Sequence, residues 1–143
     1  MLAQAELNRS YTKIVAPADG YVTKKSVEAG NQVSVGMPLL AVVPLDDIWI
    51  VANYKETQLK RVKKGQRVTI KADMNSDRSF RGVVDSIMAG TGTAFSLFPP
   101  ENATGNYVKV VQRIPVKITL DKESNRDHGL RVGMSVVPTI IIE

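Results

Sequence analysis

The alternation of apolar and polar residues predicts a chain made mainly of short β-strands. Arg67–Ala72 has an apolar residue at every second position and charged or hydroxyl residues between them, which is the pattern of a half-buried strand. Residues 108–120 keep the same period over a longer stretch, and Pro115, on the opposite face, predicts a free edge or a kink there. Further short strands are predicted at 48–52, 83–87 and 136–142. Short strands separated by turns are typical of a small barrel or sandwich.

Two segments are predicted to be helical. Residues 1–10 are rich in Leu, Ala, Gln and Glu, which favour helix, but they carry no capping signal at their start. Residues 55–64, KETQLKRVKK, precede Gly65. Glycine commonly ends a helix, and the cations near this end would complement the helix dipole.

A short motif occurs three times along the chain. VEAGNQV at 27–33, VKKGQRV at 62–68 and LRVGMSV at 130–136 share an aliphatic residue, two positions, Gly, two positions and Val. We expect each glycine to adopt a positive φ in a turn that leads directly into a strand. The motif is too short and too irregularly spaced for a solenoid.

Composition narrows the possible functions without choosing one. The chain has 143 residues, enough for one core or two small modules, and no cysteine, which excludes disulfides, thiolate metal sites and thiol catalysis. No apolar run approaches the roughly 18 residues of a membrane helix. A formal net charge of +5 permits anionic partners.

Residues for catalysis are scarce. The single histidine, His128, lies in the polar stretch DKESNRDHGL and is expected to be solvated, because no nearby motif supplies the partners of a metal or triad site. GTG at 90–92 lacks the lysine and helix of a phosphate-binding loop. The sequence therefore predicts no catalytic residue, no metal and no cofactor.

The basic cluster in the second predicted helix is a candidate contact surface. Nucleic-acid binding would need interleaved aromatic residues, and only Tyr54 is close in sequence. A solvated helix face is the favoured interpretation. If the face contacts a partner protein, the residues expected to do so are Lys60, Arg61 and Lys64.

A second candidate surface is the segment 89–106, AGTGTAFSLFPPENATGN. A loop of this length inside a small domain is uncommon and often functional. Its apolar side chains either cover an open barrel end, the favoured interpretation, or dock into a partner. The predicted contact residues are Phe95, Leu97, Phe98, Pro99 and Asn102.

Two longer stretches carry a family resemblance. YTKIVAPADGYVTKKSVEAGNQVSVGMPLLAVVPLDDIWIVANYKETQL, residues 11–59, resembles the membrane fusion proteins, the HlyD-like periplasmic adaptors of bacterial export pumps. MAGTGTAFSLFPPENATGNYVKVVQRIPVKI, residues 88–118, is similar to the EmrA-type branch. The first stretch matches the second half of that family's lipoyl-like motif.

The resemblance implies an all-β architecture in three parts. Residues 1–10 would be the end of an α-hairpin helix, 11–45 the second half of the lipoyl-like motif, and 46–143 a β-barrel domain. The chain would thus begin near the end of the returning helix, without the first half-motif or the membrane anchor. Two copies would then be able to complete each other's half-motif. The family's modules are unmodified, and Lys24 and Lys25 are expected mid-strand and facing solvent.

The resemblance also implies a function and partners. The parent would be a periplasmic adaptor, anchored to the inner membrane, of a tripartite multidrug efflux pump. It would link an inner-membrane major-facilitator drug/proton antiporter to an outer-membrane channel protein and self-associate into a ring, without binding nucleic acid. Two alternatives remain open: a lipoyl- or biotinyl-type carrier domain, and a basic oligonucleotide-binding barrel.

Overall fold

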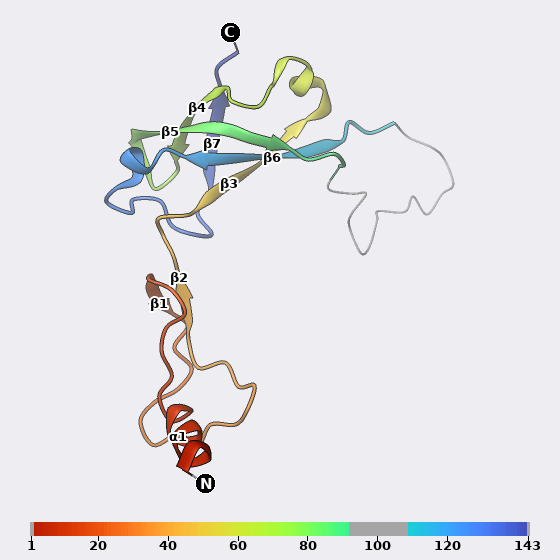
Figure 1. The fold of residues 1–143 in the computed structure, drawn as a ribbon. Coiled ribbons are helices and arrows are strands. Elements are labelled where there is room, and N and C mark those ends of the chain that lie inside the picture. The colour runs from red at the N-terminus through yellow and green to blue at the C-terminus, as the bar shows by residue number, and fades with distance from the viewer. Residues whose placement is uncertain (1, 92–108, 143) are drawn as a thin grey trace. The chain divides into compact units, whose positions relative to one another are not determined.

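The computed structural model describes residues 2–91 and 109–142, which divide into two compact units, residues 1–45 and 46–143 (Figure 1). The chain contains seven β-strands, one α-helix and two 3₁₀-helices within the described residues. None of the helices in these ranges has the length and apolar character to cross a membrane.

Unit 1 contains little regular structure. Helix α1 (Leu2–Ser10) lies at its start, and β1 (Tyr21–Thr23) pairs antiparallel with β2 (Ala41–Val43). The intervening chain bends twice, and the amide of Ser26 donates to the carbonyl of Leu39 at 2.8 Å. The predicted N-terminal helix is confirmed. The assignment of this unit to half of a lipoyl-like motif stays a prediction.

The glycines of the repeated motif adopt the positive φ that the sequence predicts. The φ angles are 94° at Gly30, 88° at Gly65 and 87° at Gly133, and Gly36 makes a fourth such turn at 84°. In each turn the residue after the glycine donates its amide to the carbonyl three positions earlier, and glycine adopts this conformation without the strain that a Cβ adds. A strand begins at Arg67, shortly after Gly65, and another at Val136, shortly after Gly133. After Gly30 the next strand begins only at Ala41.

Unit 2 is a five-stranded antiparallel sheet that curls into a nearly closed barrel (Figure 1). Its strands follow the order β3-β6-β5-β4-β7. The 3₁₀-helices η1 (Glu56–Arg61) and η2 (Lys122–Asn125) lie between strands along the chain. The strands are β3 (Trp49–Lys55), β4 (Arg67–Ala72), β5 (Asn75–Ile87), β6 (Arg113–Leu120) and β7 (Val136–Ile140).

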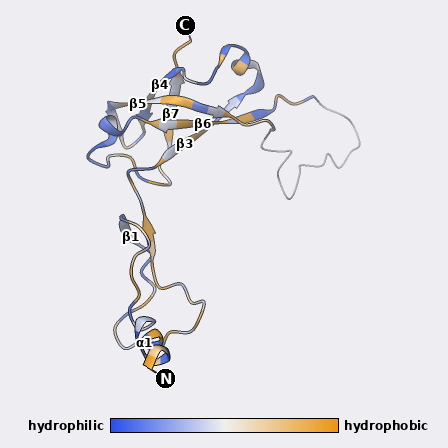
Figure 2. Cartoon of the chain, in the orientation of Figure 1, coloured by the Kyte–Doolittle hydropathy of each residue, from blue (hydrophilic) through white to orange (hydrophobic). Residues whose placement is uncertain are grey.

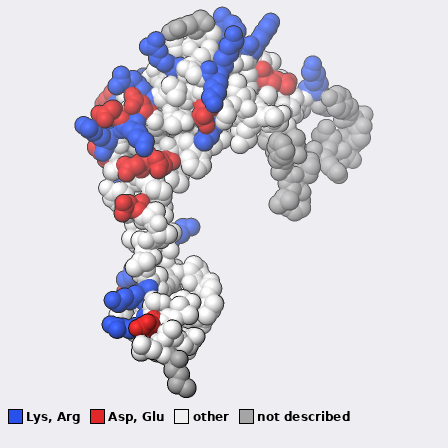
Figure 3. Space-filling view, viewed as in Figure 1, with Lys and Arg blue, Asp and Glu red and all other residues white. Residues whose placement is uncertain are grey.

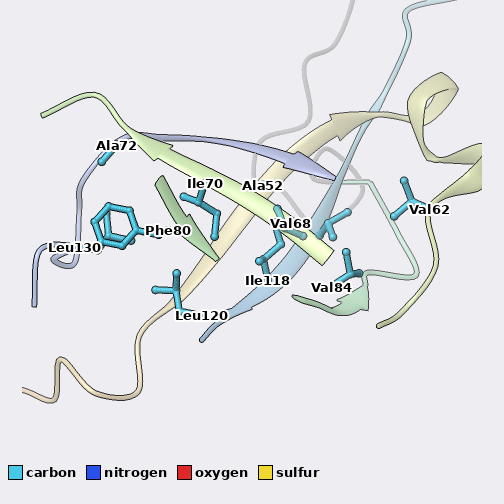
Figure 4. Packing of buried hydrophobic residues seen from close by; sticks show 11 residues of the cluster. Ala52, Val62, Val68, Ile70, Ala72, Phe80, Val84, Ile118, Leu120 and Leu130 are labelled. Carbon is cyan, nitrogen blue, oxygen red and sulfur yellow. The ribbon is translucent and has the colours of Figure 1, made fainter. Parts of the chain in front are cut away.

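The core of unit 2 lies on the inner face of this sheet (Figure 4). The alternation predicted for β4 is confirmed, because Val68, Ile70 and Ala72 are buried and Arg67 and Lys71 are exposed. Phe80 on β5 is the largest fully buried side chain. The cluster consists of Ala52, Val62, Val68, Ile70, Ala72, Phe80, Val84, Val116, Ile118, Leu120 and Leu130.

One side-chain hydrogen bond joins the two edge strands of the sheet. The hydroxyl of Tyr54 on β3 donates to the carbonyl of Pro138 on β7 at 2.8 Å. The amide of Ile141 donates to the carbonyl of Arg67 on β4. Hydrogen-bonded pairs alternate with non-bonded ones along an antiparallel ladder, so Pro138, three residues earlier and opposite Ile70, points its backbone N and O away from β4. Proline therefore stands where an edge strand would expose a free N–H.

Several predicted elements differ from the structure in type or in bounds. The segment 55–64 forms the short 3₁₀-helix η1 rather than an α-helix, because Val62 leaves the helix with extended backbone and is buried. The strand predicted at 108–120 is regular only from Arg113. β6 is paired with β3 along nearly its whole length but with β5 only as far as Val116, so Pro115 lies at the end of the pairing with β5 rather than inside it.

The strand predicted at 83–87 is much longer in the structure, where β5 begins at Asn75. Its register shifts by one residue against β6 between Val84 and Ser86, and a bulge of this kind increases the local bend of a strand. The early part of β5 contacts η2, because Arg78 donates to Asp127 and to the carbonyl of Ser124. The guanidinium of Arg78 also lies 4.8 Å from the centroid of the Phe80 ring.

Candidate functional site

Five exposed cations follow one another between η1 and the start of β4. They include the three predicted contact residues Lys60, Arg61 and Lys64, together with Lys63 and Arg67, and the five are here termed the basic segment. Residues 57–72 contain no Asp or Glu. Lys and Arg side chains gather over this part of unit 2 in the space-filling view (Figure 3).

Apolar neighbours fix the basic segment to the barrel. Leu59 packs against the core and Val62 is buried, so the residues between and after them are directed outward. The turn that follows is held on β5 by two backbone bonds, from Gly65 to the carbonyl of Val84 at 2.8 Å and from Val84 to the carbonyl of Gln66 at 2.9 Å. The cations therefore project from a defined backbone.

The helix dipole explains fewer of these cations than the sequence predicted. η1 ends at Arg61, so only Lys60 and Arg61 lie in its last turn. Lys63 and Lys64 belong to the turn around Gly65 and lie outside the helix. Since the dipole acts only within the first and last turns of a helix, their clustering needs another explanation.

An open depression lies beside the basic segment. It has a volume of about 310 Å³ and is lined by Lys63, Lys64, Gly65, Gln66, Arg67 and Ile141. Within the segment, Lys64 pairs with Asp85: Oδ1 of Asp85 is 3.9 Å from Nζ of Lys64, and its Oδ2 is 3.3 Å from Nζ of Lys117. A long, exposed pair of this kind neutralises little of the local charge.

The outer face of β3 and β6 carries an aromatic residue that the sequence analysis did not single out. Trp49, the only tryptophan, is 59% exposed, and Val51 beside it on the same face is also exposed. The Nζ atom of Lys117 lies 5.2 Å from the Trp49 ring centroid, within cation–π range. The sequence pattern that indicates this outer face is the alternation of Trp49 and Val51 with the inward-facing Ile48 and Ile50.

Unit 1 exposes most of its apolar side chains, and no residue from 2 to 44 is buried. Figure 2 shows the apolar character of β2 and part of α1. In a monomer, an apolar surface of this extent usually marks an interaction site. The large exposed residues are Leu2, Leu7, Tyr11, Ile14, Val15, Tyr21, Val22, Val33, Val35, Met37 and Leu40.

Two expectations about single residues are corrected. The side chain of His128 is only 25% exposed, with Nε2 3.8 Å from Oδ1 of Asp46, so it is not a fully solvated histidine. Lys24 and Lys25 follow the end of β1 rather than lying mid-strand. Lys24 has a positive φ of 47°, and Lys25 pairs with Glu28 at 2.8 Å. Both lysines do face solvent, as expected.

The described residues contain no group of three or more His, Asp or Glu side chains placed to hold a metal. The second predicted surface lies outside the described residues, because its contact residues fall between 92 and 108. They are Phe95, Leu97, Phe98, Pro99 and Asn102, and their role stays a prediction.

Comparison with known proteins identifies relatives over nearly the whole chain. The fatty acid resistance protein FarA of Neisseria gonorrhoeae is 52% identical over 136 residues, which cover 94% of this chain and 34% of FarA. The multidrug export protein EmrA of Haemophilus influenzae is 48% identical over 142 residues, covering 99% of this chain and 36% of EmrA. The chain thus spans about a third of the length of these relatives.

The fold has relatives among solved structures as well. The structure of the periplasmic adaptor protein EmrA superposes with a TM-score of 0.61 at 30% identity, over 99% of this chain and 36% of that one. The profile of the AAEA-like beta-barrel domain matches residues 47–143, which is most of unit 2. The chain therefore belongs to the AAEA-like beta-barrel family, within the EmrA-type membrane fusion proteins.

Proposed function

We propose that this chain is the barrel-bearing part of a periplasmic adaptor in a tripartite multidrug efflux pump. The adaptor links an inner-membrane drug/proton antiporter of the major-facilitator type to an outer-membrane channel. The observation that carries the proposal is the likeness to the EmrA adaptor structure over 99% of this chain, at 30% identity. The names of FarA and EmrA, a resistance and an export protein, point to the same class of activity.

The role proposed for the chain is structural rather than enzymatic. Its described surfaces offer exposed apolar and basic side chains, which suit protein contacts. The outer face around Trp49 is available for contact with a neighbouring adaptor in a ring. The segment 89–106 is proposed to contact partner proteins.

The exposed apolar side chains of unit 1 support its assignment as one half of a lipoyl-like motif. Among the strands of the described residues, β1 and β2 pair only with each other, over three residues, and such a short hairpin is marginally stable alone. The partner proposed for it is the first half-motif of the full-length protein. In this chain by itself, a second copy would take that place around a twofold axis.

The efflux assignment is tested in the source bacterium with the full-length gene. Deletion is expected to lower the minimal inhibitory concentrations of several unrelated hydrophobic compounds, and a plasmid copy is expected to restore them. Cross-linking in living cells, with a tag on the adaptor, is expected to recover a major-facilitator transporter and an outer-membrane channel. Unchanged inhibitory concentrations together with recovery of neither protein would refute the proposal.

Fractionation and intact mass test the finer statements. The full-length protein is expected in the membrane fraction, with this region accessible to a protease added to the periplasm. Its mass is expected to show no lipoyl or biotinyl addition at Lys24 or Lys25. A protease-protected, cytoplasmic protein would contradict the periplasmic location, and a modified lysine would favour the carrier alternative.

A further inference from the structure

The barrel carries an amphipathic surface that the adaptor role does not require. We propose that the basic segment, together with Ile141 and Ile142, docks unit 2 on an anionic phospholipid bilayer. The bilayer surface would contact the open depression beside Gly65. This inference goes beyond the pump assignment and is tested without any pump component.

The first argument is the local charge. The basic segment carries five cations, as many as the formal net charge of +5 for the entire chain. No carboxylate occurs between residues 57 and 72, and the ion pair of Lys64 with Asp85 is long, at 3.9 Å. Cations clustered on one exposed surface attract a membrane bearing anionic lipids, and each contributes separately to that attraction.

The second argument is the apolar group set among the cations. Ile141 lines the depression together with Lys63, Lys64 and Arg67. It is 46% exposed, and the next residue, Ile142, is 39% exposed. Neither belongs to the core cluster, whose contact with β7 is made by Val136 and Ile140. Apolar side chains rimmed by cations match the boundary between lipid headgroups and acyl chains.

The same features distinguish a bilayer from other anionic partners. Among the described residues that form the basic segment or line the depression, none is aromatic, whereas single-stranded nucleic acids are bound largely by stacking on aromatic rings. A phosphate ion would use the cations and leave the isoleucines without a role. Only a partner with both anionic and apolar layers uses the whole surface.

The flexibility of lysine is compatible with this use. Lys60, Lys63 and Lys64 are exposed, and long side chains of this type keep the ammonium group at a polar surface while the methylene groups cover apolar area. The backbone that carries Lys63 and Lys64 is held on β5 through Gly65 and Gln66. The headgroups would therefore meet a fixed arrangement of attachment points.

Co-sedimentation with lipid vesicles tests the proposal on the full 143-residue chain. The vesicles contain phosphatidylcholine with about 30% phosphatidylglycerol, and vesicles of phosphatidylcholine alone serve as the uncharged control. Lys60→Gln/Lys63→Gln is expected to lower the partition coefficient about 25-fold, because each removed cation weakens binding about fivefold. Ile141→Ser is expected to lower it further, by a few-fold, through lost apolar insertion.

The matched control removes the same formal charge elsewhere on unit 2. Lys122→Gln/Arg126→Gln changes two cations beside η2, where Lys122 pairs with Asp47 and Arg126 with Glu123, each at 3.4 Å. This variant is expected to change the partition coefficient less than about twofold. Circular dichroism melting of every variant shows whether unit 2 remains folded.

Each remaining outcome counts against the proposal. Equal losses in the two double variants would show that binding follows net charge rather than this surface. An unchanged partition coefficient for Ile141→Ser would show that the contact is ionic alone, and would contradict the proposed insertion of the isoleucines. Tighter binding to a single-stranded oligonucleotide than to the charged vesicles would favour a nucleic-acid surface, and absence of vesicle binding would overturn the proposal outright.

Discussion

The hydrogen bond between Tyr54 and Pro138 is expected to contribute measurably to the stability of the barrel. It spans the two edge strands at 2.8 Å, a near-ideal length for a hydroxyl donor. Tyr54→Phe removes the donor, leaves the ring in place and deprives the Pro138 carbonyl of this partner. A hydrogen bond of this kind contributes about 1 kcal/mol net. We therefore expect the free energy of unfolding of unit 2 to fall by about 1 kcal/mol.

Urea unfolding followed by Trp49 fluorescence measures this loss. Trp49 is the only tryptophan and lies on β3, the same strand as Tyr54. With a urea dependence of about 1–3 kcal/mol per molar for a small domain, the midpoint is expected to fall by about 0.3–1 M. Tyr11→Phe is the matched control, because Tyr11 is 70% exposed in unit 1.

Alkaline pH provides a second test of the environment of Tyr54. Burial raises the pKa of Tyr54 above its ordinary value of 10.0. A raised pKa in the folded state means that the stabilising contribution is fully present below about pH 10 and is lost as the pH rises through the pKa of the folded protein. Tyr54→Phe is expected to lose this part of the alkaline destabilisation. The reasoning would be refuted if Tyr54→Phe had the same urea midpoint as Tyr11→Phe at pH 7 and if its stability fell with rising pH in the same way as that of the original chain.

Three further substitutions test other parts of unit 2. Gly82→Ala places a Cβ 2.6 Å from the carbonyl oxygen of Thr119 on β6, so we expect a loss of about 1–3 kcal/mol in thermal or urea unfolding. An unchanged midpoint would show that the two strands separate without cost. A Cβ at Gly65 would meet open space, but the φ of +88° is unfavourable for alanine. Gly65→Ala is therefore expected to lower the free energy of unfolding by about 1–2 kcal/mol. Gly65→Asn is expected to cost less, and equal losses for the two variants would contradict the argument from φ. The hydrogen bond from Arg78 lowers the pKa of Asp127, so its contribution is present above about pH 3.8 and is lost as the pH falls through the lower pKa of the folded state. The melting temperatures of Asp127→Asn and the original chain are therefore expected to differ at pH 7 and to converge in acid, whereas a constant difference would count against the ion pair.

Local patterns predicted those parts of the fold that depend on neighbouring residues. β4 was predicted with its correct bounds, because each of its residues follows the two-residue period. The positive φ of Gly30, Gly65 and Gly133 was likewise predicted, since the turn is closed within four residues. These features need no contact from distant parts of the chain.

Features that depend on distant contacts could not be read from the sequence in this way. The first half of β5 is polar, and Arg78 joins it to the carbonyl of Ser124 in η2 and to Asp127 just after η2, which is 49 residues from Arg78. The burial of Val62 ends η1 early, although the sequence continues with helix-forming lysines. The placement of Ile141 among the cations of the basic segment arises only when β7 pairs with β4.

The strand order of unit 2 has a consequence for its synthesis and refolding. β4 and β5 form a hairpin that closes between Ala72 and Asn75, so it can form soon after it is made. β3 pairs with β6, and Trp49 lies opposite Thr119, a separation of 119 − 49 = 70 residues. At about 5–20 residues per second, a ribosome needs roughly 4–14 s to supply that partner. During this interval β3 is a nascent strand that awaits its neighbour, and long-range closure of this kind slows folding. Chaperone binding to nascent chains is therefore expected to concentrate on β3 until β6 emerges.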